Sequence, residues 1–428
     1  MLLQGPAAAR GLVPLVLLLA LSGPAAAQPA PAATTAPSGP TPTPVAAPPD
    51  TAAPAAAPLT APAVAPTATP AASPAPAPTP SPSPTPEPWA ALQILDSAVP
   101  PGEMRRLAWR TGFGYGLVDE PVPVLVARGS SRGPTLCLTA AVHGDELNGI
   151  EIVRRVVSGI DPTALKGTVI GVPIVNVHGF QRRSRYLPDR RDLNRYFPGD
   201  PEGSLASRVA HDFFGRIIAQ CEQLVDVHTG SFYRSNLPQL RADLREPAVV
   251  EMTKHFGAIT VLHSSAADGT LRGAAVAAGI PAVTMEVGEP NRLQADDVAL
   301  AVKGLETLLA GMEMSGKRRL WDRAQPVFYE SRWVRVDRGG ILFSAVELGQ
   351  SVRPGDVLGT VTDPLSNVYT EITAPIAGRV LGRALNQFVM PGFAAFRIGI
   401  ETTETEVAEE PPQPSDEAAA ADDDQPPN

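Results

Sequence analysis

Two histidines and a glutamate stand at the ends of two apolar, strand-like segments. TLCLTAAV is followed directly by His143, with Glu146 three residues later, and QLVDV is followed directly by His228. Catalytic zinc is commonly held by three imidazole and carboxylate ligands, which leave one coordination position for water. The His-x-x-Glu spacing alone is a weak signal, but a third ligand from a second strand end completes the set. We therefore expect one Zn²⁺ per chain on His143, Glu146 and His228.

Asp226 lies two residues before His228, so on a strand both side chains face the same way. A carboxylate in that place can hold the imidazole of a metal ligand. An aspartate that caps a helix or anchors a loop is an equally open interpretation.

A further strand-like segment, PAVTMEVG, carries Glu286 among apolar residues. Carboxylates are rarely buried in a strand without a partner. Beside a metal-activated water, Glu286 is expected to act as the general base and then to protonate the leaving amine. The alternative is a structural ion pair between Glu286 and a buried arginine.

An arginine-rich segment, NVHGFQRRSRYLPDRRDLNRYFPGD, lies between the two ligand clusters. Guanidinium groups match carboxylates with two parallel hydrogen bonds, so Asn194 and Arg195 are expected to bind a substrate carboxylate. Asp192 is expected to orient an arginine, and Arg185 to face the oxyanion formed on the attacked carbonyl. A nucleic-acid partner is not expected, because aromatic residues, Pro and Gly interrupt the segment and the chain has no basic excess.

The elements that must position these groups alternate between β-like and helical patterns from about Pro121 to Leu309. Apolar runs such as VPVLVA, GTVIGVPIV and ITVLH are separated by helical segments at Leu147–Val157, Leu205–Ile218 and Asp297–Leu309. This alternation indicates an α/β fold with a mostly parallel or mixed sheet covered on both faces. In such sheets the reactive groups gather beyond the carboxyl ends of the strands.

From about Pro326 to Ile400 the pattern changes to short strands separated by Gly and Pro, which predicts a small all-β unit. Parts of it are similar to biotinyl and lipoyl carrier domains. Carriers attach their cofactor to a lysine, however, and the last lysine of this chain is Lys317. We expect an α/β domain at residues 89–320 and an appended β domain at 321–403. Structural packing is the favoured role of the β domain, and shaping one side of the active-site mouth is the other.

The two ends of the chain have the composition of targeting and disordered segments. Residues 1–27 combine Arg10, an apolar run and an Ala-x-Ala ending, which predicts a cleaved signal peptide; an uncleaved membrane anchor is the alternative. Residues 28–88 are rich in Pro, Ala and Thr, which predicts a disordered linker. The net charge of −9 equals the nine acidic residues of the tail at 404–428, so the rest is neutral overall.

The chain has two cysteines, Cys137 in a strand-like run and Cys221 near a helix end. One disulfide in an oxidising compartment and two buried thiols are both open.

Four motifs, H-G-D-E, D-L-N-R-x-F-P-G, V-D-V-H-T-G and T-M-E-V-G, together resemble the succinylglutamate desuccinylase/aspartoacylase family over about Pro121 to Leu309. The resemblance implies the mixed central sheet of the related zinc carboxypeptidases and an appended C-terminal β domain. It implies the same three zinc ligands and the same role for Glu286, with Asn194 and Arg195 at the substrate carboxylate. Arg272 stands in a loop where family members can place another substrate arginine.

These observations predict an exported zinc-dependent hydrolase that cleaves an amide bond of an N-acyl amino acid or a related carboxylate-bearing substrate. One alternative is an amidase or carboxypeptidase for cell-wall peptides, with cell-wall association. A second is a non-catalytic binding module that contains a metal.

Overall fold

The computed structural model describes residues 89–110, 120–316 and 325–400. The predicted signal segment, linker and acidic tail lie outside the described residues, as does the predicted domain boundary at residue 320. These features stay predictions.

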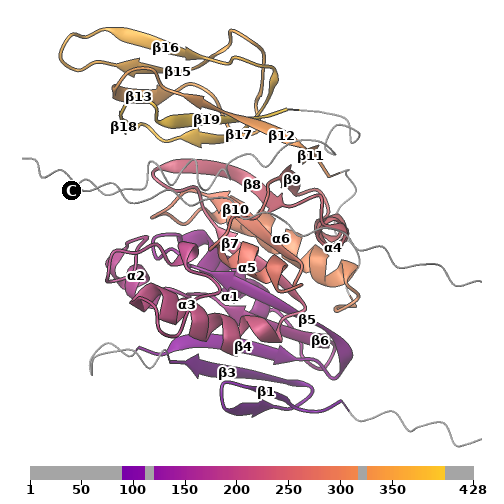
Figure 1. Ribbon diagram of the computed structural model, residues 1–428. Coiled ribbons are helices and arrows are strands. Elements are labelled where there is room, and N and C mark those ends of the chain that lie inside the picture. Colours follow the sequence, from indigo (N-terminus) through magenta and orange to yellow (C-terminus); the bar gives the residue numbers. More distant parts are fainter. Residues whose placement is uncertain (1–88, 111–119, 317–324, 401–428) are drawn as a thin grey trace, which may run out of the picture. The chain divides into compact units, whose positions relative to one another are not determined.

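The described chain is built around a large mixed sheet that runs through most of the molecule (Figure 1). Its central strands lie in the order β4, β6, β5, β7, β10, β8. The strands from the N-terminal side to the centre are β1 Leu92–Ile94, β2 Ser97–Val99, β3 Glu103–Trp109, β4 Val122–Arg128, β5 Ser131–Ala140, β6 Lys166–Val172, β7 Gln223–His228, β8 Arg234–Ala242, β9 Thr260–His263 and β10 Ala282–Gly288.

Helices cover both faces of this sheet, as the sequence predicts. The α-helices are α1 Leu147–Ser158, α2 Val177–Arg182, α3 Leu205–Arg216, α4 Pro247–Thr253, α5 Leu271–Ala277 and α6 Ala295–Gly311, with 3₁₀ turns η1 Leu193–Arg195, η2 Ile218–Gln220 and η3 Lys254–Phe256. Successive strand residues point to opposite faces. Leu136 and Leu138 belong to the core under α1 and α6, whereas Cys137 belongs to the core under α3 and α5. The mixed α/β fold with a covered sheet is therefore confirmed.

Helix α1 shows why these residues form a covering helix. Ile152, Val153, Val156 and Val157 recur at helical spacing and are buried against the sheet, while Glu151 stays on the outer face with Arg154 and Arg155. Glu146 occupies the N-cap position but its side chain makes no capping bond. Its carboxylate instead contacts His143 and His228.

Strand β8 was not anticipated from the sequence. Its residues RSNLPQLRA contain two arginines, a proline and two amides, so they lack the apolar run that marks the other central strands. Tertiary packing overrides this weak local preference, because β8 pairs antiparallel with β10 and parallel with β9.

The C-terminal strands form an all-β region that is continuous with the central sheet, because β17 pairs antiparallel with β8. A separate four-stranded sheet in the order β16, β15, β13, β18 packs with these strands around their own apolar core. The strands are β11 Val327–Phe328, β12 Glu330–Arg335, β13 Gly340–Ser344, β14 Ser351–Val352, β15 Val357–Thr362, β16 Tyr369–Thr373, β17 Gly378–Ala384, β18 Gln387–Val389 and β19 Ala394–Ile400.

Cys137 of β5 and Cys221, just before β7, form a disulfide. Of the two interpretations of the cysteines, the structure has the bridge. It joins the two strands whose far ends carry His143 and His228.

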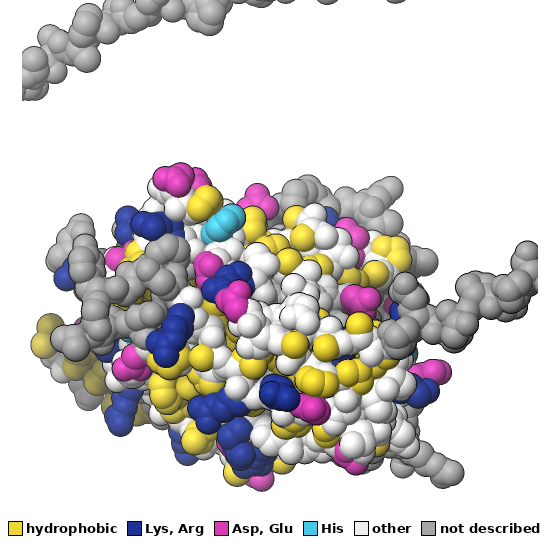
Figure 2. Space-filling view, turned by 90° about the horizontal axis from the view of Figure 1, so that it is seen from below, with side chains coloured by type: hydrophobic (Ala, Val, Ile, Leu, Met, Phe, Trp, Pro, Cys, Tyr) yellow, Lys and Arg dark blue, Asp and Glu magenta, His cyan; other side chains and the backbone are white. Residues whose placement is uncertain are grey.

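The surface beside β3 carries charged side chains of both signs. Viewed from that side, Lys and Arg side chains are interspersed with Asp and Glu (Figure 2). None of the described helices is both long and apolar enough to cross a membrane.

Candidate metal centre and substrate cavity

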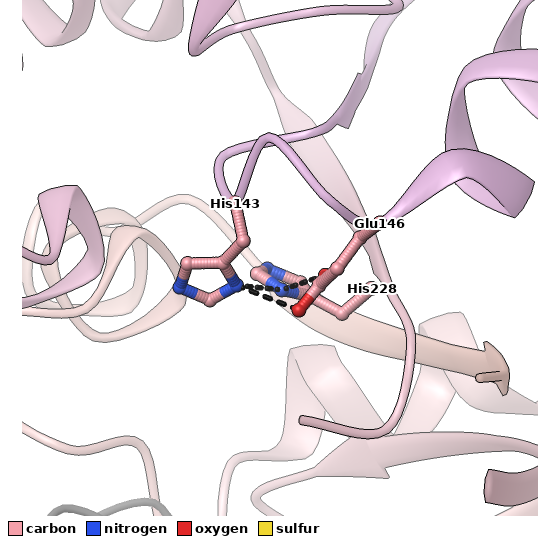
Figure 3. A group of neighbouring side chains, drawn as sticks. All are labelled: His143, Glu146 and His228. Carbon is pink, nitrogen blue, oxygen red and sulfur yellow. Dashed lines mark hydrogen bonds and ion pairs between the residues drawn. The ribbon is translucent and has the colours of Figure 1, made fainter. Parts of the chain in front are cut away.

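The three expected metal ligands meet at the carboxyl ends of β5 and β7. His143 and Glu146 lie in the turn between β5 and α1, and His228 is the last residue of β7 (Figure 3). One ligand atom from each lies within 4.8 Å of the others, and all three side chains are buried. The structure therefore brings together the set that the spacing of the motifs predicts.

Hydrogen-bond acceptor atoms of the three residues lie close together. The Nδ1 atoms of His143 and His228 are 3.2 Å apart. The two carboxylate oxygens of Glu146 lie 2.8 Å from His143 Nδ1 and 3.0 Å from His228 Nδ1. The backbone N–H of Thr229 donates to Glu146 Oε2 and fixes the carboxylate.

Two further carboxylates hold the outer edges of the imidazoles. Asp226 Oδ2 lies 2.6 Å from His228 Nε2, and Asp192 Oδ1 lies 3.0 Å from His143 Nε2. Thr139 donates to the second oxygen of Asp226. A carboxylate partner places the ring hydrogen on Nε2, so in the neutral rings both Nδ1 lone pairs point at each other and at Glu146. Such a set of acceptors suits a cation, and imidazole with carboxylate suits a zinc-like divalent ion.

The pKa shifts of the three residues also favour positive charge at this point. Burial lowers the pKa of His228, but Asp226 and Glu146 outweigh it and raise this pKa well above its usual value. Burial and Arg185 lower the pKa of His143, but the opposite effects of Glu146 and Asp192 are larger. The pKa of His143 is therefore above its usual value. Burial raises the pKa of Glu146, yet the two imidazoles hold it well below its ordinary range.

Arg185 lies against the same cluster. Its guanidinium donates to Asp192 Oδ2 at 2.9 Å and 3.1 Å, and its Nη1 atom lies 3.2 Å from His143 Nδ1 and 3.4 Å from Glu146 Oε1. The expectation that Asp192 orients an arginine matches this geometry. Asp192 also contacts His143, which the sequence did not reveal.

Glu286 stands beside the ligands on the neighbouring strand. In the parallel pair of β10 and β7 it is in register with His228. Asn236 donates to Glu286 Oε2 at 2.9 Å, and Arg241 Nε lies 3.2 Å from Glu286 Oε1. The buried ion pair that was the structural alternative is thus present, and the carboxylate also lines the cavity described below.

The segment that carries Asn194 and Arg195 is tied to the start of α5. Asn194 Oδ1 accepts from the backbone N–H of Leu271, and Arg272 donates to the backbone oxygens of Ser264 and Ser265. Arg195 lines the cavity. The expected position of Arg272 in a loop is wrong, because Arg272 is the second residue of helix α5 and is buried. Neither Asn194 nor Arg272 is among the residues that line the cavity. Substrate binding by Asn194, Arg195 and Arg272 stays a prediction.

A cavity opens over the ligands and Glu286. Trp333 of β12 contributes to the wall, so the C-terminal β region shapes part of this site. The residues that line it are His143, Glu146, Arg185, Arg195, His228, Thr229, Gly230, Ser231, Arg234, Asn236, Arg241, Glu286 and Trp333.

Sequence reasoning missed the lining residues of β8 and β12: Arg234, Asn236, Arg241 and Trp333. A signal was present in RSNLPQLRA, where polar residues stand on both sides of Leu237 and Leu240, in a segment that begins four residues after the V-D-V-H-T-G motif.

Known proteins are similar to this chain in sequence. Residues 132–312 match the family model described as the succinylglutamate desuccinylase/aspartoacylase catalytic domain. The chain is 30% identical over 263 residues to the N-alpha-acetyl-L-2,4-diaminobutyric acid deacetylase of Halomonas elongata, a match that covers 58% of this chain and 75% of the relative.

Solved structures agree with the fold. The product-bound ectoine utilization protein EutE (DoeB) from Ruegeria pomeroyi is similar with a TM-score of 0.63 and 25% identity, over 70% of this chain and 95% of that chain. The succinylglutamate desuccinylase/aspartoacylase from Rhodobacter sphaeroides has a TM-score of 0.64 and 24% identity, over 71% and 96%.

The mixed sheet is covered by helices, and the His, Glu, His cluster lies at the carboxyl ends of its strands. The protein is therefore of the α/β class and carries a candidate metal centre. This chain belongs to the succinylglutamate desuccinylase/aspartoacylase family.

Proposed function

We propose that this protein is an exported, zinc-dependent hydrolase that cleaves the amide bond of a small N-acyl amino acid. The relative from Halomonas elongata is named a deacetylase of an N-acyl amino acid, and the cavity brings basic side chains, Arg185 and Arg195 among them, next to the ligand cluster. The observation that carries the proposal is the placement of Glu286 in register with His228, on the wall of the cavity that contains the ligand cluster.

The residues divide the chemistry among them. Zinc held by His143, Glu146 and His228 would supply a Lewis acid and an activated water. Glu286 accepts a proton as the water oxygen adds to the amide carbonyl carbon, and returns it to the nitrogen as the carbon–nitrogen bond breaks. Arg185 donates hydrogen bonds toward the charge that develops on the carbonyl oxygen.

The positively charged side chains of the cavity wall orient the substrate. Arg195 lies on the cavity wall and has a guanidinium suited to a carboxylate. A carboxylate held there keeps the amide carbon at a fixed distance from Glu286, which is how binding energy is converted into rate.

The proposal is tested by measuring amine release from a panel of substrates by the chain and by its Glu286→Gln variant. The panel contains N-α-acetyl-L-2,4-diaminobutyrate, N-succinyl-L-glutamate, N-acetyl-L-aspartate and cell-wall stem peptides. Hydrolysis of an N-acyl amino acid by the unaltered chain, with a loss of at least about 100-fold in the variant, is expected. Cleavage of stem peptides alone would favour the cell-wall alternative, and an inert, metal-loaded chain would favour a binding module.

Export is the second part of the proposal. The disulfide between Cys137 and Cys221 supports it, because such bridges persist in oxidising compartments. The expected result is a mature chain that begins at Gln28 and is recovered outside the cytoplasm, as measured by mass spectrometry of cell fractions. Recovery of the full-length chain from the cytoplasm would contradict export.

A further inference from the structure

Both carboxylate oxygens of Glu286 are held by side chains of one strand, β8. Asn236 Nδ2 donates to Oε2 at 2.9 Å, and Arg241 Nε faces Oε1 at 3.2 Å. All three side chains are buried. The hydrogen bond from Asn236 and the ion pair with Arg241 restrict rotation of the carboxylate, and both come from β8.

The backbone explains how two residues five apart reach the same carboxylate. In a regular strand they would face opposite sides of the sheet. Here Glu286 pairs with Gln239, whereas Gly288 pairs with Asn236, so three steps along β8 match two along β10. The irregularity turns Asn236 back to the face that carries Glu286, a known use of β-bulges near active sites.

The other edge of β8 is held by the C-terminal region. Gly382 of β17 is the register partner of Asn236, and a Cβ added at Gly382 would lie 2.8 Å from Asn236 Oδ1. Arg234 at the start of β8 donates to the backbone oxygen of Ala394 in β19. The amide of Asn236 is thus placed between a backbone from the C-terminal region and the carboxylate of Glu286.

We propose that the C-terminal β region positions Glu286, because β17 holds β8 and β8 holds the carboxylate through Asn236 and Arg241. Asn236, Arg241 and Gly382 are positioning residues, since they act through Glu286. The inference rests on the proposed role of Glu286 and adds a reason why the two regions share one sheet.

The first test is a double-variant cycle on kcat and KM, with the panel substrate that the unaltered chain cleaves fastest. Gly382→Ala and Asn236→Ala are each expected to lower kcat roughly 10- to 100-fold, because they displace or release the base. KM and zinc content should stay within about threefold, since the ligands and arginines of the cavity are untouched. The double variant should be no slower than Asn236→Ala, because the atom that the new methyl group pushes is gone.

Charge and shape variants separate positioning from general packing. Asn236→Asp keeps the size of the side chain but places an acceptor against Glu286, so it should be slower than Asn236→Ala. Asn386→Asp is the matched control, because Asn386 accepts from Ser344 N through an oxygen that aspartate retains. Arg241→Lys should keep more kcat than Arg241→Met, since it preserves the positive charge.

Additive losses in the cycle, or unchanged kcat in both Gly382→Ala and Asn236→Asp, would overturn the inference. A crystal structure of Gly382→Ala gives a readout that needs no activity. The hydrogen bond between Asn236 and Glu286 should be lost, and its retention would overturn the positioning role even if the unaltered chain hydrolyses amides. An unaltered chain that cleaves nothing would instead count against the proposed function.

Discussion

At the scale of single residues, the ligand cluster is organised by the carboxylates behind it. Asp226 and Asp192 each hold an imidazole Nε2, so both Nδ1 atoms are presented to the same point as Glu146. Without those partners each ring could rotate or carry its hydrogen on the wrong nitrogen. We therefore expect the outer carboxylates to strengthen metal binding by the three ligands.

Asp226→Asn tests this organisation. The amide has the size of the carboxylate but removes its charge and faces Thr139 with a donor, so the imidazole of His228 is held less firmly. Zinc affinity, measured by competition with a chromophoric chelator, should fall about 10- to 100-fold. Asp363→Asn, in a C-terminal turn where the carboxylate accepts from Leu365 N, is the control and should leave affinity unchanged. Equal affinity for both variants would contradict the role of Asp226.

Gly144 of the H-G-D-E motif has a packing reason to be glycine. A Cβ there would lie 2.0 Å from the backbone carbon of Gly179 in α2, so the turn that carries His143 and Glu146 lies directly on that helix. Gly144→Ala should displace the turn and lower the zinc bound per chain well below one, as measured by metal analysis of the purified protein. Gly215→Ala, in α3 with open space around it, should bind zinc normally. Full zinc occupancy in Gly144→Ala would refute this account of the turn.

At the scale of elements, the two ligand-bearing strands are joined by a covalent bond. The disulfide between Cys137 and Cys221 spans a sequence separation of 84 residues. Closing a loop of that length restricts the unfolded chain, which is worth about 4.5 kcal/mol in the chain-entropy model. The variant with both cysteines replaced by alanine should lose about that much free energy of unfolding in urea titrations. The unaltered chain with its disulfide reduced should lose a similar amount of free energy of unfolding. A loss below about 1 kcal/mol would show that the disulfide contributes little to stability.

Elements with a strong local pattern were predictable, and those defined by long-range contacts were not. The strands that end in His143 and His228 and the helix after Glu146 follow from apolar runs and helical spacing, so the metal ligands could be placed from motif positions alone. β8 has mixed polarity and owes its place to pairing with β10 and β17. The partners of Glu286 therefore remained hidden, since a buried carboxylate reveals that it needs a donor but not which strand supplies it.

At the scale of the whole molecule, the central sheet does not end where the α/β region ends. Strands β17, β19 and β12 extend it beyond β8, and Trp333 reaches the cavity from this extension. Leu262 of the α/β region packs with Phe328 and Leu381 of the C-terminal region in one buried cluster. The C-terminal region is therefore part of the sheet that carries the site.

A chain that ends after Gly316 tests this continuity. The edge of β8 that pairs with β17 would be exposed, as would Leu262, which packs against the C-terminal region. Unpaired sheet edges promote association. We expect this truncated chain to aggregate, whereas the chain to residue 400 stays monodisperse in size-exclusion chromatography. A soluble truncated chain that binds zinc would show that the two regions are independent.

The most direct test of the central claim is amine release before and after removal of the metal. The purified chain would be stripped with a chelator, shown by metal analysis to be free of metal, and titrated with Zn²⁺ while hydrolysis of its best N-acyl amino acid is followed. The proposed site predicts that activity disappears and returns in full at about one equivalent of zinc. Unchanged hydrolysis by the stripped chain would contradict a metal-assisted mechanism at His143, Glu146 and His228.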